Sequence, residues 1–212
     1  MIRGTGVPAD APPTVLIAGH WDTRLIADRE TEPARRQPVP GANDGASGTA
    51  VILELARALS VDRPSVTVAF ALLDGEDLGE HYYGSKVLAA ELTRRRAARW
   101  RPNGAVVLDM VGRRGLRCTT EIQSVSRAAA LWNRVHASAD ALGLAGHFHG
   151  PAQRVNDDHV ALQRAGIQSI VLIDYTDPHW HTLDDVPEHC APESLLAVGS
   201  VVLHFVRGLR AP

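Results

Sequence analysis

The feature that most constrains the fold of this chain is the alternation of short apolar runs with longer helical periods. Four runs rich in Val, Ile and Leu are typical of strands, at residues 14–18, 65–73, 105–110 and 169–174. Continuous apolar runs of this kind indicate strands that are buried on both faces of a parallel sheet. Helical periodicity follows them at residues 47–59, 83–99, 126–142, 157–165 and 192–209. The alternation predicts an α/β fold with an open sheet and helical crossovers.

Length and charge limit the organisation of the chain and its partners. The 212 residues contain no linker-like or repetitive stretch, so we expect a single domain over residues 1–212. The 22 basic and 24 acidic residues nearly balance. Clustered arginines occur at 94–96 and 99–101, and a solvated helix face is the favoured interpretation of them. We therefore expect no nucleic-acid partner, and the oligomeric state stays open.

The ends and the cysteines bear on the cellular compartment. No stretch reaches the roughly 20 apolar residues of a membrane helix, and no apolar segment of a signal peptide follows Met1. We expect a cytoplasmic protein without a membrane partner, or a periplasmic or secreted one if the N-terminus has been trimmed. Cys118 and Cys190 lack the CxxC spacing of a metal or redox site, and the sequence leaves open whether they pair.

Polar side chains that can carry chemistry follow the apolar runs. In an open α/β sheet, ligands bind beyond the carboxyl ends of the strands, near the point where the strand order reverses. The polar segment 24–40 is expected to be a surface loop beside this edge. The residues placed at the strand ends are His20, Asp22, Glu76, Asp77, Asp109 and the pair Trp180 and His181.

Asp44 reaches the same region in a different way, from a glycine-rich segment at residues 40–48 that precedes a predicted helix. Two interpretations of its carboxylate are open. It could cap the helix N-terminus, or it could bind a metal ion in a loop that the glycines allow to approach closely. In the second case Asn43 could orient the carboxylate.

Glu76, Asp77 and His181 complete a candidate metal site. The acid pair follows a very apolar run, where a bound cation would compensate the buried charge. One acid of the pair can bind the metal while the other faces a substrate. His181 offers a neutral imidazole, whose other nitrogen could donate to Asp184 or Asp185. A catalytic zinc typically takes three such ligands and keeps a fourth position open, so the sequence predicts a zinc site here.

Neighbouring residues leave alternatives open. His179 could add a second imidazole to the site. His20 and Asp22 could hold a second metal or join loops by hydrogen bonds. Asp157, at a predicted helix start, is by default a helix cap.

Seven segments, spread over nearly the whole chain, carry a family resemblance. They are GHWDTR at 19–24, PGANDGASG at 40–48, LLDGEDLG at 72–79, YGSKVLA at 83–89, LDMVG at 108–112, NDDH at 156–159 and WHTLDD at 180–185. In this order they resemble the zinc-dependent glutaminyl cyclases of animal type and, more closely, their bacterial relatives. That family shares its fold with the co-catalytic zinc aminopeptidases. The resemblance implies a three-layer α/β/α sandwich with a largely parallel, mixed central sheet.

Residue by residue, the resemblance also implies a site. Asp44, Asp77 and His181 would bind one zinc ion, Glu76 would be the general acid and base, and Asp157 would hold the amino group of the substrate.

The resemblance further implies that Trp180 and Trp21 line the substrate pocket. Asp109 would support Asp157 and Glu76 through a shared hydrogen-bond network. The implied reaction converts the N-terminal glutamine of a peptide or protein into pyroglutamate with release of ammonia.

Aminopeptidases of the same fold give a second interpretation, with two zinc ions and an activated water. The residues that would serve them are His20, Asp44, Glu76, Asp77, Asp109 and His181, all of which are present. The tryptophan before His181, the NDDH segment and the GHWDTR segment favour the cyclase. An inactive binding module of the same fold is the least favoured interpretation, because Glu76 and the ligand set are both retained.

Overall fold

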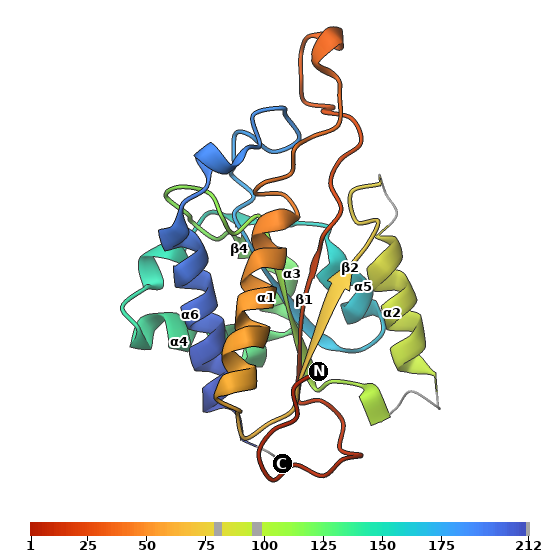
Figure 1. Cartoon of the computed structure of the whole chain (residues 1–212), viewed down its shortest axis with the longest axis vertical. Coiled ribbons are helices and arrows are strands. Elements are labelled where there is room, and N and C mark those ends of the chain that lie inside the picture. Colours follow the sequence, from red (N-terminus) through yellow and green to blue (C-terminus); the bar gives the residue numbers. More distant parts are fainter. Residues whose placement is uncertain (79–81, 95–98, 211–212) are drawn as a thin grey trace.

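The computed structural model describes residues 1–78, 82–94 and 99–210 (Figure 1). Its centre is a four-stranded sheet with the strand order β2-β1-β3-β6. Each neighbouring pair of strands is parallel. The strands are β1 (Val15–His20), β2 (Val68–Leu73), β3 (Gly104–Asp109) and β6 (Gln168–Ile173).

Helices cover both faces of this sheet, as Figure 1 shows, and give the predicted three layers. One face is covered by α1 (Ala46–Val61), α4 (Ala129–Ala141) and α6 (Pro192–Gly208). The other is covered by α2 (Tyr83–Thr93) and α5 (Asp158–Arg164), which pack on each other. A further helix, α3 (Ile122–Arg127), contacts β6. The α/β sandwich expected from the sequence is therefore confirmed.

Short elements complete the described chain. A separate two-stranded parallel sheet pairs β4 (Thr120–Glu121) with β5 (Ala152–Gln153). Among the described residues, 3-10 turns lie in loops at η1 (Pro33–Arg35), η3 (Ala145–His147) and η4 (Pro187–His189).

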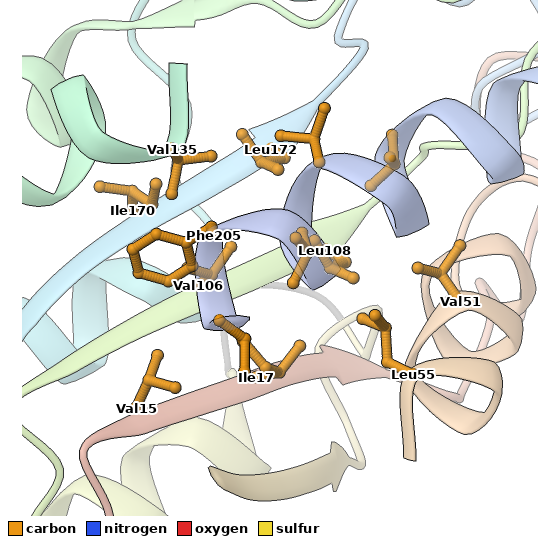
Figure 2. Packing of buried hydrophobic residues seen from close by; sticks show 14 of the residues in the cluster. Val15, Ile17, Val51, Leu55, Val106, Leu108, Val135, Ile170, Leu172 and Phe205 are labelled. Carbon is orange, nitrogen blue, oxygen red and sulfur yellow. The ribbon is translucent and has the colours of Figure 1, made fainter. Parts of the chain in front are cut away.

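The alternation of side chains along each strand divides the core into two halves. Val15 and Ile17 of β1 face the cluster beneath α1 and α6, which Figure 2 shows with Leu108 and Phe205. Leu16 of the same strand faces the cluster beneath α2 and α5. Because β1, β3 and β6 are buried along nearly their whole length, both faces of these strands must be apolar, as their sequences are.

The structure corrects three predictions about these elements. First, β2 is not buried on both faces: it lies at the sheet edge, and Leu72 is exposed there. Second, the sheet, predicted as largely parallel but mixed, is parallel in all three pairs of its named strands, because helical crossovers return each strand in the same direction. Among the described residues, its antiparallel component is limited to one isolated bridge between Ile2 and Val68.

Third, two helices have different bounds. The helix predicted over 83–99 ends at Thr93, and residues 95–98 of that prediction lie outside the described residues. The helix predicted over 126–142 is two helices, α3 and α4, because the backbone at Ala128 is not helical.

Two glycines let α1 approach the sheet closely. A Cβ atom at Gly48 of α1 would lie 2.2 Å from the carbonyl oxygen of Leu108, and one at Gly19 of β1 would lie 2.5 Å from the same oxygen. Only residues without a Cβ fit this contact. It brings the start of α1 directly against the ends of β1 and β3.

The remaining expectations concern cysteines, basic residues and membranes. Cys118 and Cys190 are both free thiols. Within the arginine-rich segment, Arg94 pairs with Glu91, and Arg101 donates to the carbonyl oxygens of residues 165 and 166. None of the helices that the structure describes has the length and apolarity to cross a membrane.

Candidate active site

The predicted site residues meet at the carboxyl ends of the strands. His20 is the last residue of β1 and Asp109 the last residue of β3. The chain leads from β1 to β2 on one side, and β3 lies on the other side of β1, so the strand order reverses between β1 and β3. Polar groups gather at this switch point, as general rules for open α/β sheets predict.

Four side chains form the centre of the site. Ligand atoms of His20, Asp44 and Asp77 all lie within 4.8 Å of one another, and all three residues are buried. His181 joins them, since its Nε2 lies 3.6 Å from Asp44 Oδ2 and 3.3 Å from Asp77 Oδ1. Both predicted imidazoles therefore contact the Asp44 carboxylate. We call these four residues the metal cluster.

The Asp44 carboxylate is not a helix cap. Helix α1 begins two residues later, its N-cap is Gly45 with φ of 98°, and no side chain caps it. Asp44 is instead fixed through its backbone, whose N–H donates to Asp185 Oδ2 at 3.0 Å. Asp185 Oδ1 also accepts from the backbone N–H of Asn43 at 2.7 Å. This double contact leaves the Asp44 carboxylate available to the cluster.

The suggestion that Asn43 orients the Asp44 carboxylate is wrong. The Asn43 amide donates to Asp177 Oδ2 at 2.6 Å, and its oxygen accepts from the backbone N–H of Gly112 at 2.7 Å. The side chain therefore points away from Asp44 and joins three loops. The loop is oriented by Asp185 instead.

His181 is held from the segment 24–40. Its backbone lies in the left-handed region, with φ of 60°. Its Nδ1 is 2.9 Å from Asp28 Oδ1, so Asp28, rather than Asp184 or Asp185, fixes the imidazole. The second-imidazole alternative fails for a similar reason, because the His179 ring contacts Asp177 and stacks on His189 instead.

His20 connects the cluster to Asp109. Its Nε2 lies 3.0 Å from Asp109 Oδ1 and 3.2 Å from Asp44 Oδ1, and its Nδ1 contacts the carbonyl oxygen of Asp22. The Asp22 carboxylate accepts from the backbone N–H groups of Glu76 and Asp77, at 3.3 and 3.1 Å. Asp22 could hold a second metal or join loops by hydrogen bonds, and the structure shows the hydrogen bonds between loops.

The charges of the cluster suit a cation. Burial raises the pKa of Asp44 and of Asp77, and each is raised further by a neighbouring carboxylate. Burial opposes the protonation of His181, but the carboxylates of Asp77, Asp44 and Asp28 outweigh it and raise its pKa. Asp77 Oδ2 is buried and has no hydrogen-bond partner among the described residues. Buried acids with an unused oxygen and imidazoles opposite them fit a divalent metal ion.

Glu76 and Asp157 lie next to the metal cluster. Burial raises the pKa of Glu76 well above its usual range, and Asp157 and Asp109 add to the effect. Asp157 caps α5 by accepting from the backbone N–H of Asp158, and its Oδ2 is buried without a hydrogen-bond partner in the described structure. Burial, followed by Asp109 and Asp158, raises its pKa well above the usual range. The two acids can receive a positively charged group.

Asp109 reaches these acids through its charge. Its carboxylate contacts His20, whereas its negative charge raises the pKa of both Glu76 and Asp157. The shared hydrogen-bond network that the sequence implied stays a prediction.

A pocket of about 390 Å³ opens over the cluster. We call it the inner pocket. Trp180 lines it, with its ring centroid 4.2 Å from that of His181 and 4.8 Å from that of Tyr175. The lining residues that belong to the site are Asp44, Glu76, Asp77, Asp109, Trp180 and His181.

Trp21 does not line this pocket. Its side chain is 57% exposed. Its backbone N–H donates to Leu73, so residue 21 extends the alternation of β1, and its side chain points opposite to that of His20. The expectation that Trp21 lines the pocket is therefore wrong.

Sequence reasoning missed several residues of the site. Asp28 and Arg24 come from the segment 24–40, where Arg24 donates to Asp28 and to the carbonyl oxygen of Asp77. Tyr82 and Arg154 line the inner pocket from other loops. No local pattern marks these residues, because their roles arise from contacts between distant segments.

The fold and the site together define a class: a parallel α/β domain that presents carboxylates and imidazoles for a metal ion at its switch point. Comparison with known proteins narrows this class. Residues 3–206 match the model of peptidase family M28, and the chain belongs to this family.

Similar proteins in this family have different activities in their names. A glutaminyl cyclase from Fimbriiglobus ruber is 32% identical, with a TM-score of 0.86 over 95% of this chain and 72% of its own. A Zn-dependent exopeptidase from Parabacteroides distasonis is 28% identical, with a TM-score of 0.86 over 94% of this chain and 74% of its own.

Among curated relatives, aminopeptidase YwaD of Bacillus subtilis is 29% identical over 199 residues, which are 90% of this chain and 40% of that protein. The chain thus spans less than half the length of this relative.

Proposed function

We propose that this protein is a glutaminyl-peptide cyclotransferase, which converts the N-terminal glutamine of peptides or proteins into pyroglutamate and releases ammonia. The position of Trp180 carries the proposal. Its ring packs against His181 and walls the inner pocket beside the metal cluster. An aromatic wall at this place suits a glutamine side chain folded back on its own amine. The similarity to a solved glutaminyl cyclase supports the same conclusion.

Asp44, Asp77 and His181 would hold a zinc ion, which would supply a Lewis acid for the γ-carbonyl oxygen of the glutamine. Glu76 takes a proton from the α-amine as its nitrogen bonds to the side-chain carbonyl carbon. Glu76 then gives a proton to the leaving nitrogen as the amide carbon–nitrogen bond breaks and ammonia departs. Its raised pKa is closer to neutral pH than that of an ordinary glutamate. A carboxyl whose pKa lies near the working pH can both accept a proton and return it.

Asp157 holds the attacking amine in this proposal. Its unused, buried Oδ2 is available as an acceptor, and its charge acts on Glu76. Fixing a flexible glutamine with its amine near its own amide carbon contributes to the rate, because the reacting atoms are already in proximity.

One observation favours a second candidate, a two-zinc aminopeptidase. His20 Nε2 lies 3.2 Å from Asp44 and 3.0 Å from Asp109. These three residues could hold a second ion that shares Asp44 with the first. The similarity to a solved Zn-dependent exopeptidase and to YwaD supports this alternative.

A paired assay on zinc-loaded protein separates the two candidates. Ammonia release from a glutaminyl dipeptide is measured beside release of free amino acid from a leucyl substrate, together with the zinc content. The cyclase predicts ammonia without amino acid and one zinc per chain. Amino acid without ammonia, with two zinc ions per chain, would overturn the proposal in favour of the aminopeptidase.

The Glu76→Gln variant tests the role of the base. The amide is nearly isosteric but cannot carry the proton, so ammonia release should fall by about 10²-fold or more while zinc content is unchanged. Glu188→Gln, an exposed substitution outside the site, is the matched control. Retained turnover in Glu76→Gln would remove Glu76 from this role.

A further inference from the structure

A second cavity adjoins the inner pocket. It has a volume of about 330 Å³ and shares Tyr82 and Asn156 with the inner pocket as lining residues. The Tyr82 hydroxyl donates to the carbonyl oxygen of Asn156 at 3.1 Å, so the two residues form a bridge between the cavities. We call the second cavity the outer pocket. Its other lining residues are Lys86, Asp157, Val160, Ala161 and Arg164.

Exposed cationic side chains line the two pockets near the boundary between them. Arg154 lines the inner pocket, while Lys86 of α2 and Arg164 of α5 line the outer pocket. Within residues 1–78, 82–94 and 99–210, none of these three cations forms an ion pair or donates a side-chain hydrogen bond. Arg24 differs, because it lines the inner pocket but is neutralised by Asp28 at 2.6 Å.

The two pockets therefore differ in their balance of charges: carboxylates outnumber Arg24 and Arg154 in the inner pocket, and cations outnumber Asp157 in the outer pocket. The inner pocket contains the carboxylates of the metal cluster and Glu76, which attract an amine. The outer pocket presents Lys86 and Arg164, which attract an anion. Electrostatic potentials of opposite sign in neighbouring pockets orient a peptide that carries an amine and a carboxylate. They also favour such a peptide over one that carries two positive charges.

Asp157 indicates the direction in which a peptide runs. It lines the outer pocket, and its charge also acts on Glu76 in the inner pocket. An amine held between these two acids therefore lies at the boundary between the pockets. The residues that follow it leave past Tyr82 and Asn156, towards the three cations.

We propose that three cations at the boundary of the two pockets, Arg154 of the inner pocket and Lys86 and Arg164 of the outer pocket, select peptides with an acidic side chain in the second or third position. This inference rests on the proposed function, which places the N-terminal amine of the substrate between Glu76 and Asp157. The expected substrates of the active site are peptides with an N-terminal glutamine followed closely by Glu or Asp.

The test compares three amidated tripeptides, which carry no terminal carboxylate: glutamine followed by Glu-Ala, by Gln-Ala and by Lys-Ala. We expect kcat/KM for ammonia release to fall in that order, by about tenfold or more from the first to the last at low salt. High salt should reduce the difference, because exposed charges are screened over about 10 Å or less. Equal values for the three peptides would overturn the proposal.

Variants that remove a positive charge identify the residues responsible for the preference for the acidic peptide. The double variant Lys86→Gln and Arg164→Gln, and the single variant Arg154→Gln, should each reduce the ratio of kcat/KM between the acidic and the basic peptide several-fold. Arg57→Gln, which removes a cation on α1 that is paired with Glu54, is the matched control and should leave the preference unchanged. A preference that survives both test variants would refute recognition by these cations.

A binding measurement keeps this inference separate from the proposed function. Titration calorimetry with the same three peptides on zinc-loaded Glu76→Gln needs no turnover. Tighter binding of the acidic peptide without ammonia release from the parent enzyme would overturn the proposed function and support the outer pocket. Ammonia release from the parent enzyme with equal binding of the three peptides would support the proposed function and overturn the selection of acidic peptides.

Discussion

Replacement of Glu121 by Gln should destabilise the segment that carries Asp157. Glu121 is fully buried and accepts from four donors. Two are backbone N–H groups of α3, at Gln123 and Ser124, which it caps. The others are the backbone N–H of Val155 and the Nε2 of His159, both at 3.2 Å. These last contacts lie on either side of Asp157.

The magnitude follows from the pKa of the Glu121 carboxyl. Burial raises it, but His159 and the backbone N–H groups outweigh burial and lower it from 4.5 to about 2. A decrease of about 2.5 units corresponds to about 3 kcal/mol of stability carried by the ionised form. Since the folded-state pKa is depressed, this stability is fully present above pH 4.5 and is lost as the pH falls through about 2.

The assay is urea unfolding of the metal-free protein, followed by circular dichroism between neutral pH and about pH 3. Glu121→Gln should lower the unfolding free energy by about 3 kcal/mol at neutral pH, with a smaller difference below pH 4.5. Glu91→Gln, an exposed acid paired with Arg94, is the control and should change little. A loss of less than about 1 kcal/mol, or a difference independent of pH, would refute the reasoning.

Two further predictions concern packing and the metal. Gly48→Ala should cost more than about 2 kcal/mol, because its Cβ would lie 2.2 Å from the Leu108 carbonyl oxygen. Gly199→Ala in α6 meets only Val51 at 3.8 Å and should be neutral or stabilising in the same denaturation experiment. Equal losses would contradict the close approach of α1. Chelation should lower the Tm of the parent protein but not that of His181→Ala, as differential scanning calorimetry can measure. An unchanged Tm in the parent protein would remove the metal cluster as a stabilising site.

Three of the strands could be predicted from the sequence because burial on both faces requires mostly apolar residues. The runs that became β1, β3 and β6 satisfy this requirement. The run that became β2 satisfies it too, yet Leu72 is exposed at the edge. Hydrophobicity alone does not distinguish an edge strand from a central one, because the difference lies in which neighbours pair with it.

The site was predictable where a residue follows a strand or a glycine-rich turn. Asp44, Asp77 and His181 come together as expected. The residues that hold them were not predictable, because Asp28 and Asp185 act on partners 153 and 141 positions away. Trp21 is a different case: strand alternation from the inward His20 predicts that it points away from the site, which is the opposite of what the family resemblance implies.

The segment 24–40 couples two properties that an engineer would want to adjust separately. Asp28 holds the imidazole of His181, and the neighbouring Arg29 lies 4.8 Å from the Trp180 ring that walls the pocket. A library of variants in this segment, made to alter which peptides are accepted, would also change how firmly the metal is retained. Improved variants should therefore be screened for metal retention and selectivity together, since a selection for either property alone would shift the other.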